Sequence, residues 1–417
     1  MDAVDNAFRP VPRTGVIFVM NEAAQRGFHY GNPDWVNLGQ GAPETGPLPD
    51  APPRLQRAPL DAALSEYGPV PGTQDLREAV AALYNHRYRR GKKSQYTAQN
   101  VAIAAGGRAA LTRIAASLGG VHLGHLLPDY TAYEELLAIF RAFVPIPISL
   151  HEDEGFTLSQ ARLQREIRGA GLAAMLLSNP CNPTGVAVTG EDLDAWVHTA
   201  RAHGCALILD EFYAHYLYGD DVPEASSAAE FVDDVDRDPV VVVDGLTKNW
   251  RYPGLRLSWT VGPRSVIERV ASAGSFLDGG APHLLQRAAL PLLEPSHAST
   301  EARAIQAAFA DKRAYAMGRL KQLGLSQSAP SGGAFYLFAG LQHLPPTLRN
   351  GMDFFRACLD ERVICVPGVF FDVDPGKRRE HLPSRLQHFV RISFGPSMPE
   401  IKEGLDRIEA LIERHRA

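Results

Sequence analysis

Short apolar runs alternate with longer stretches of helical periodicity from about residue 100 to about residue 245. A short apolar run bounded by turn residues is typical of a strand that is buried on both faces. Such strands form parallel sheets, because the helix that connects two parallel strands covers a face of the sheet. The alternation therefore predicts an α/β fold with a mostly parallel sheet flanked by helices. We assign five runs to strands: 101–105, 125–128, 172–178, 205–210 and 240–244.

The chain after about residue 300 has a different pattern. A long helical stretch is followed by the strand-like sequences AFYLF and HFVRISF and by the amphipathic segment EIKEGLDRIEALIERH, a mixture that predicts a smaller α+β domain. Residues 10–53 are rich in Pro and Gly and predict an extended arm with a short helix near 17–25. We therefore expect three parts: an N-terminal arm that contributes to the small domain (1–55), a large domain (56–305) and a small C-terminal domain (306–417).

Composition narrows the class of protein. The 417 residues carry a net charge of −5, which argues against nucleic acid or an anionic membrane as the main partner. The N-terminal sequence has no basic start followed by an apolar core, and no apolar run approaches the about 20 residues that span a membrane. The four cysteines form no C-x-x-C pair and no zinc-type spacing. We therefore expect a cytoplasmic protein with buried free thiols and no metal site.

The residues that follow the strands are the candidate ligand-binding residues, because ligands of an open parallel sheet bind outside the carboxyl ends of its strands. Gly106 and Gly107 follow the first run and suit a phosphate at a helix N-terminus, although a plain tight turn explains them equally well. Tyr130 follows the second run, where an aromatic ring stacks on a planar ligand or packs in the core. The third run leads into NPCNPTG, a rigid loop that projects Asn182.

The last two runs end in an acid and lead to a lysine. Asp210 terminates a buried strand, where a carboxylate is costly without a partner, so it either caps the next segment or pairs with a cationic ring nitrogen. Lys248 lies just beyond the fifth run, where an apolar setting can lower the pKa of a lysine that forms a Schiff base, although by itself the position fits an ordinary surface lysine better. Arg256 follows eight residues later and suits a phosphate.

Together these strand ends match one planar, anionic ligand that carries an aldehyde. The lysine can form a Schiff base with the aldehyde, the acid can pair with the ring nitrogen, and the aromatic residue can stack on the ring face. Asn182 and Tyr213 are available for a ring hydroxyl, and the residues suited to the phosphate are Gly107, Arg108 and Arg256.

The motifs NPCNPTG, LILDEFY and DGLTKNWRYPGLR, in that order, resemble those of the pyridoxal 5'-phosphate (PLP)-dependent enzymes of fold type I, the aspartate aminotransferase superfamily (class I/II aminotransferases). The resemblance extends from NLGQGAPE to FVRISFG and covers nearly the whole chain. It implies a large domain with a mostly parallel sheet plus a smaller α+β domain. It also implies PLP as the cofactor and a homodimer with shared active sites.

The resemblance assigns roles to the cofactor-binding residues. Lys248 is similar to the lysine that holds PLP as a Schiff base and shuttles the proton, and Asp210 is similar to the partner of the ring nitrogen. By the same resemblance, Tyr213 and Asn182 bind the ring oxygen, and Tyr130 stacks on the ring. The catalytic set is therefore Lys248, Asp210 and Tyr213.

The remaining roles concern the phosphate and the substrate. Arg256 resembles the phosphate ligand, together with the turn that consists of Gly107, Arg108 and Ala109. Tyr67 is similar to the tyrosine that reaches the phosphate of the neighbouring subunit. The substrate site that the resemblance implies contains Arg391, which would bind the α-carboxylate with both arms of its guanidinium, together with Gly41 and Asn182.

One position departs from the pattern of the family. Many relatives carry a serine three residues before the lysine as a phosphate ligand, whereas this chain has Gly245. We expect Thr247 or the backbone to compensate.

The resemblance implies an aminotransferase that moves an amino group from an L-amino acid to a 2-oxo acid. A PLP-dependent lyase, cyclase or oxidase of specialised metabolism shares the same motifs and remains the alternative. A ligand-sensing module of a transcription regulator would carry a helix-turn-helix, and only about 35 residues precede NLGQG. The apolar residues of the arm, Val16, Ile17 and Phe18, favour neutral or aromatic substrate side chains.

Overall fold

A computed structural model describes residues 11, 13, 15–58 and 60–416. Most of the N-terminal sequence in which we expected no targeting signal lies outside these residues. The largest sheet of the molecule has seven strands in the order β2-β8-β7-β6-β5-β3-β4. Their bounds are β2 (Val101–Ala104), β3 (His122–Leu127), β4 (Val144–Ser149), β5 (Leu172–Ser178), β6 (Ala206–Asp210), β7 (Val240–Gly245) and β8 (Ser258–Val261).

The five predicted apolar runs correspond to strands of this sheet, and the predicted fold class is confirmed. Two strands, β4 and β8, were not predicted. β4 contains Pro145 and Pro147, which are tolerated because β4 is an edge strand with a free side. β8 is antiparallel to both of its neighbours, β2 and β7, whereas the other neighbouring pairs are parallel.

Helices pack in two groups against the seven-stranded sheet. α4 (Gly107–Ser117) contacts α5 (Tyr133–Ile139) and α8 (Arg264–Leu277), and α6 (Gln160–Ala170) contacts α7 (Gly190–His203). The strand order reverses direction after β4, so right-handed crossovers put α5 and α6 on opposite faces of the sheet. The carboxyl ends of the central strands are thereby left open to a ligand.

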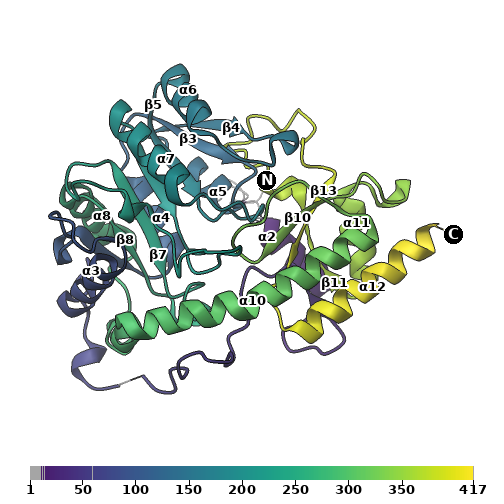
Figure 1. The fold of residues 1–417 in the computed structure, drawn as a ribbon, viewed down its shortest axis with the longest axis horizontal. Helices are drawn as coiled ribbons and strands as arrows, with labels where there is room; N and C mark the ends of the chain where they lie inside the picture. The colour runs from purple at the N-terminus through teal and green to yellow at the C-terminus, as the bar shows by residue number, and fades with distance from the viewer. Residues whose placement is uncertain (1–10, 12, 14, 59, 417) are drawn as a thin grey trace, which may run out of the picture.

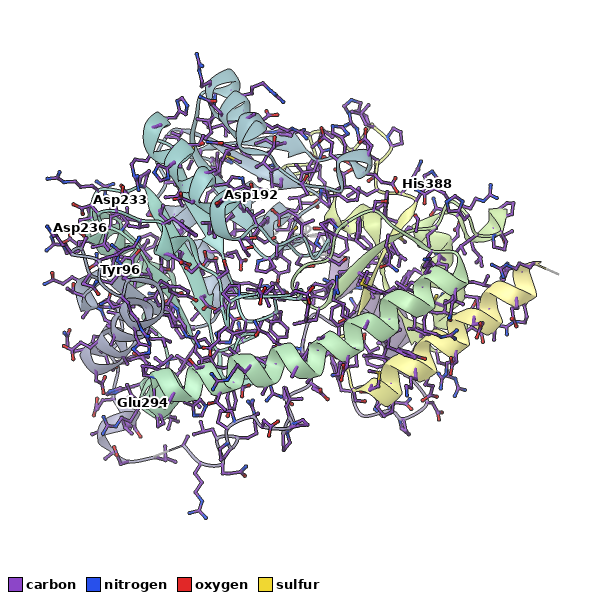
Figure 2. The ribbon with its side chains drawn as sticks, in the orientation of Figure 1. Tyr96, Asp192, Asp233, Asp236, Glu294 and His388 are labelled. Atoms are coloured by element: carbon purple, nitrogen blue, oxygen red, sulfur yellow. The ribbon has the colours of Figure 1, made fainter. Side chains whose placement is uncertain are left out.

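The longest helix, α10 (Pro295–Leu323), joins the two parts of the molecule. It runs from the neighbourhood of α3 (Gln74–Tyr88) to the smaller sheet, where it lies beside α12 (Met398–Arg416) (Figure 1). Figure 2 labels Glu294 at the beginning of this helix. It also labels His388, which lies on the opposite side of the molecule just before β13 (Phe389–Ser393).

The smaller sheet has four strands in the order β12-β13-β10-β9 and is antiparallel. Its strands are β9 (Ser326–Gln327), β10 (Tyr336–Gly340), β12 (Val366–Pro367) and β13 (Phe389–Ser393), and α11 (Gly351–Asp360) packs on it. The two predicted strands AFYLF and HFVRISF are β10 and β13, which are direct neighbours.

The N-terminal arm joins this smaller part. α2 (Gly15–Gln25) is the helix predicted near 17–25, and β1 (Val36–Asn37) pairs in parallel with β11 (Val363–Ile364). The three-part division at residues 55 and 305 stays a prediction.

The four cysteines, Cys181, Cys205, Cys358 and Cys365, are free and buried. Within the described ranges, every helix is too short or too polar to cross a membrane. The same residues contain no cluster of three His, Cys, Asp or Glu side chains that could hold a metal ion.

Candidate active site

A cavity of about 450 Å³ lies at the carboxyl ends of the central strands and is closed on one side by the arm and by β13. Of the catalytic, cofactor-binding and substrate-binding residues that the resemblance assigns, all but Ala109 and Tyr67 line it. Those that do are Gly41, Gly107, Arg108, Tyr130, Asn182, Asp210, Tyr213, Lys248, Arg256 and Arg391. Segments far apart in the chain therefore meet around one concave, polar space.

Lys248 follows β7 and reaches into the cavity, where its Nζ donates to the carbonyl oxygen of Gly41. Its own carbonyl oxygen accepts hydrogen bonds from the Tyr216 hydroxyl (2.9 Å) and from the backbone N–H of Arg251 (2.9 Å). Burial, followed by the nearby arginines, lowers the pKa of Lys248 to about 7. A large fraction of this amine is therefore neutral, and so nucleophilic, near neutral pH.

Asp210 ends β6 and faces the same cavity. Its Oδ2 accepts a hydrogen bond of 2.9 Å from the hydroxyl of Tyr133. Burial raises the pKa of Asp210 to about 6, although the Tyr133 hydrogen bond and the Lys248 charge favour the ionised form. Tyr133 was not predicted as a site residue; its position three residues after Tyr130, at the start of α5, was the available signal.

Two glycines shape the start of α4. A Cβ at Gly106 would overlap the guanidinium of Arg256, and φ at Gly106 is 90°, a conformation that only glycine adopts readily. A Cβ at Gly107 would come within 2.5 Å of the Phe212 ring. The glycines thus let Arg256 approach the N-terminus of α4, where backbone N–H groups and a cation can share an anion.

The structure explains why Gly245 replaces the serine of many relatives. A Cβ at this position would lie 2.5 Å from the carbonyl oxygen of Leu257, because β8 runs close alongside. Thr247 lines the cavity, and its hydroxyl oxygen is buried with no hydrogen-bond partner among the described residues. It is therefore available to a ligand, as expected from the sequence.

Arg391 lies in β13 and is 1% exposed. Its Nη1 donates to Asn182 Oδ1 (2.8 Å) and its Nη2 donates to the carbonyl oxygen of Gly39 (2.7 Å). Its Nε is buried without a partner in the described part of the chain. A buried guanidinium with a free donor and no carboxylate partner fits an incoming carboxylate.

Tyrosine hydroxyls connect the two ends of the cavity. The Tyr213 hydroxyl lies 2.9 Å from the hydroxyl of Tyr336, a cavity residue in β10 that the sequence analysis had placed only in a strand. At the other end, Arg108 Nη2 donates to the hydroxyl of Tyr130 at 3.2 Å. The side chain of Arg108 therefore extends into the cavity, and its role toward a phosphate stays a prediction.

Tyr67 lies outside the cavity and is 98% exposed. Of the apolar arm residues, Val16 lines the cavity together with Met20. Ile17 is exposed, and Phe18 packs against Phe370 with their ring centroids 5.3 Å apart. The arm thus contributes apolar side chains to the wall, together with the polar Gln40, but only Val16 of the predicted three is among them in the described part of the chain.

The chain is similar to one known family and to proteins of known structure. The family described as "Aminotransferase class I and II" matches residues 33–408. The valine–pyruvate aminotransferase of Mycobacterium tuberculosis is 30% identical over 407 residues, which cover 95% of this chain and 96% of that protein. The aspartate aminotransferase of Pyrococcus abyssi is 25% identical over 390 residues, covering 93% and 94%. A crystal structure of an aminotransferase from Mycobacterium tuberculosis has a TM-score of 0.77 at 25% identity, with 99% of each chain covered.

Proposed function

Since the chain belongs to the class I and II aminotransferase family, we propose that it binds PLP in this cavity and moves the amino group of an L-amino acid to a 2-oxo acid. The observation that carries the proposal is the common cavity of Lys248, Asp210 and Arg391. These three side chains suit an aldehyde, a cationic ring nitrogen and a carboxylate, in that order.

The residues present fit the cofactor. Thr247, Arg256 and the N-terminus of α4 would hold the phosphate, and the unpartnered hydroxyl of Thr247 supports this assignment. Lys248 would hold the cofactor covalently, and Tyr130 would cover the ring face. Tyr213 and Asn182 would face its ring oxygen. When bound, PLP supplies an electron sink for the pair left behind when the substrate Cα–H bond breaks.

The chain's own residues would orient the substrate and move one proton. Arg391 binds the α-carboxylate through its guanidinium, and Gly41 leaves room for the substrate at the backbone. The Lys248 amine lies in the cavity and would accept the proton from the substrate Cα. Burial raises the pKa of Asp210 to about 6, so at neutral pH it would be a carboxylate able to pair with a protonated ring nitrogen.

The test is to add single amino acids to the purified protein, to assay the matching 2-oxo acid, and then to add 2-oxoglutarate. Stoichiometric 2-oxo acid in the first half-reaction, with the original absorbance restored in the second, supports transamination. Release of ammonia or consumption of oxygen without restoration would favour the lyase, cyclase or oxidase alternative. Lys248→Ala should abolish the reaction, whereas Lys321→Ala, which removes an exposed lysine of α10, should not.

The cavity also points to a second copy of the chain. Tyr67 is 98% exposed, and two other large apolar side chains, Leu60 and Phe276, are also exposed. Exposed apolar side chains of this size are available to an interface. The homodimer that we propose would bring Tyr67 to the phosphate of the partner.

A cytoplasmic location is consistent with the four buried free thiols, which suit a reducing compartment.

A further inference from the structure

Tyr336 touches three groups of the candidate active site at once. Its hydroxyl lies 2.9 Å from that of Tyr213, and its ring lies 4.2 Å from the guanidinium carbon of Arg391. The same hydroxyl would lie 3.3 Å from a Cβ placed at Gly41. Tyr336 is completely buried apart from its access to the cavity.

The register of the smaller sheet sets this position. Tyr336 in β10 pairs with Ser393 in β13, and Arg391 lies two residues before Ser393. Arg391 and Tyr336 are therefore diagonal neighbours on one face of the antiparallel pair, within reach of long side chains. The Tyr213 ring packs edge-on against the Tyr336 ring, with centroids 5.6 Å apart, which holds the two hydroxyls together.

Two neutral hydroxyls at this distance share one hydrogen bond, so one of them donates and the other keeps a free proton. Burial raises the pKa of Tyr336 to about 12, and it raises the pKa of Tyr213 further above the ordinary value. Both groups therefore stay protonated. The guanidinium carbon of Arg391 lies 4.2 Å from the centre of the Tyr336 ring, and its charge lowers the pKa of Tyr336, which makes Tyr336 the better donor of the two.

We propose that Tyr336 is a positioning residue whose hydroxyl donates to the Tyr213 oxygen, so that the Tyr213 proton points to the ring oxygen of the cofactor, while its ring supports Arg391. The inference rests on the proposed function. The ionisable groups that face this pair are Arg391 from β13, Tyr130 after β3 and Asp210 from β6.

The test is an absorbance titration of the cofactor bound to Lys248 in the holoenzyme. The titrating group is the nitrogen that joins Lys248 to the cofactor (the cofactor link). In Tyr336→Phe, the pKa of the cofactor link should rise by about 0.5 to 1 unit, the change that the loss of one neutral hydrogen bond produces. Tyr213→Phe should raise the pKa of the link more. The double variant should match Tyr213→Phe alone, because Tyr336 acts through Tyr213. Independent, additive shifts would overturn the inference.

A second pair of variants separates the hydroxyl from the ring. Tyr336→Phe keeps the ring beneath Arg391 and should leave the affinity for 3-phenylpropanoate, an unreactive monocarboxylate, unchanged. Tyr336→Leu should weaken this affinity about threefold to tenfold, since a cation–π contact is lost. Equal weakening in both variants would contradict the separate role of the ring.

Tyr218→Phe is the matched control. The hydroxyl of Tyr218 donates to the carbonyl oxygen of Ala334 at 2.7 Å, so its removal costs a buried hydrogen bond near β10 without touching the cavity. The pKa of the cofactor link should stay at the wild-type value in this variant. If the cofactor absorbance were the same in the wild type and in Lys248→Ala, the proposed function would be refuted. If the wild type titrates normally and Tyr336→Phe gives the same pKa, only this inference is refuted.

Discussion

At the scale of single residues, the chemistry depends on charges held out of water. Lys248 has three arginines and one carboxylate around it, and its burial is not offset by a salt bridge. The pKa of about 7 that results is far below the ordinary value of 10.5. The protein therefore keeps a lysine as a nucleophile at a pH where surface lysines are almost fully protonated.

The first prediction uses this amine in the cofactor-free protein. Only the neutral amine attacks an aldehyde, so the rate of PLP addition should rise with pH and reach half its maximum near the Lys248 pKa of about 7. Arg108→Gln removes a nearby positive charge, so the midpoint should move to higher pH. The rate is measured from the absorbance change after rapid mixing. A midpoint near 10.5 would show that Lys248 is not desolvated.

The second prediction concerns the carboxylate site. Arg391→Lys replaces a planar two-armed donor by a single ammonium, so KM for the amino acid should rise about tenfold to a hundredfold, as expected for hydrogen bonds to a charged group. Steady-state kinetics would show this, with kcat changed less than KM. Arg303→Lys, an exposed arginine paired with Glu224, is the control. An unchanged KM in Arg391→Lys would remove Arg391 from the substrate site.

At the scale of elements, the contact of β7 with β8 controls the loop that carries Lys248. β8 leaves no room for a side chain at Gly245, so the first hydroxyl side chain that follows β7 is that of Thr247. The packing of an antiparallel strand thus leaves the hydroxyl of Thr247, and no side chain at position 245, at the cavity.

The third prediction tests this packing. Gly245→Ser should lower the free energy of unfolding by about 1 to 3 kcal/mol, the usual cost of overpacking, and should also weaken PLP retention. Gly254→Ser is the control, because a Cβ at Gly254 meets no atom within 4 Å. Denaturant unfolding and dialysis against buffer measure the two effects. Tighter PLP binding in Gly245→Ser would show that the family's serine fits after all.

The fourth prediction concerns His125, which is fully buried in β3. Burial lowers the pKa of His125 from 6.5 to about 4, so between these values the unfolded chain binds more protons than the folded one. Its contribution to stability is therefore complete above pH 6.5 and decreases as the pH falls toward 4. As the pH falls through this window, the free energy of unfolding of the wild type should decrease by up to about 1.4 kcal/mol per pH unit relative to that of His125→Gln.

Urea unfolding of both proteins between about pH 4.5 and 7.5 gives this difference. His381→Gln, at an exposed position, should follow the wild type. Parallel curves for wild type and His125→Gln would mean that His125 is accessible to protons in the folded protein.

At the scale of the whole molecule, the site is built by the arm, the large sheet and the smaller sheet together. Gly41 comes from the arm, Lys248 from the end of β7 and Arg391 from β13. A movement of one part against another would therefore change the distance between the amine and the carboxylate site.

The fifth prediction tests the proposed homodimer. Lys248→Ala and Tyr67→Ala should each be inactive or nearly so as pure proteins. Unfolding, mixing and refolding the two together should restore activity, because one site of a mixed dimer would contain both native residues. Sedimentation analysis reports the mass. Failure to complement, or an active particle with the mass of one chain, would contradict the shared site.

Local sequence was sufficient for five of the seven strands of the largest sheet and for most of the residues around the cavity. The apolar runs predicted five strands because a strand buried on both faces needs continuous apolar residues. Asp210 and Lys248 were found because Asp210 ends one such run and Lys248 follows another, where the ends of parallel strands meet. The resemblance of the motifs then named the family to which the chain belongs.

The tertiary structure alone decided which of these groups touch. The antiparallel direction of β8, the exclusion of a side chain at Gly245 and the pairing of Tyr336 with Tyr213 depend on contacts between segments distant in the chain. The pKa values of Lys248 and Asp210 depend likewise on burial, which only the packed molecule creates. Periodicity and turn residues act over a few positions, whereas desolvation and strand register arise when the whole chain has closed around the cavity.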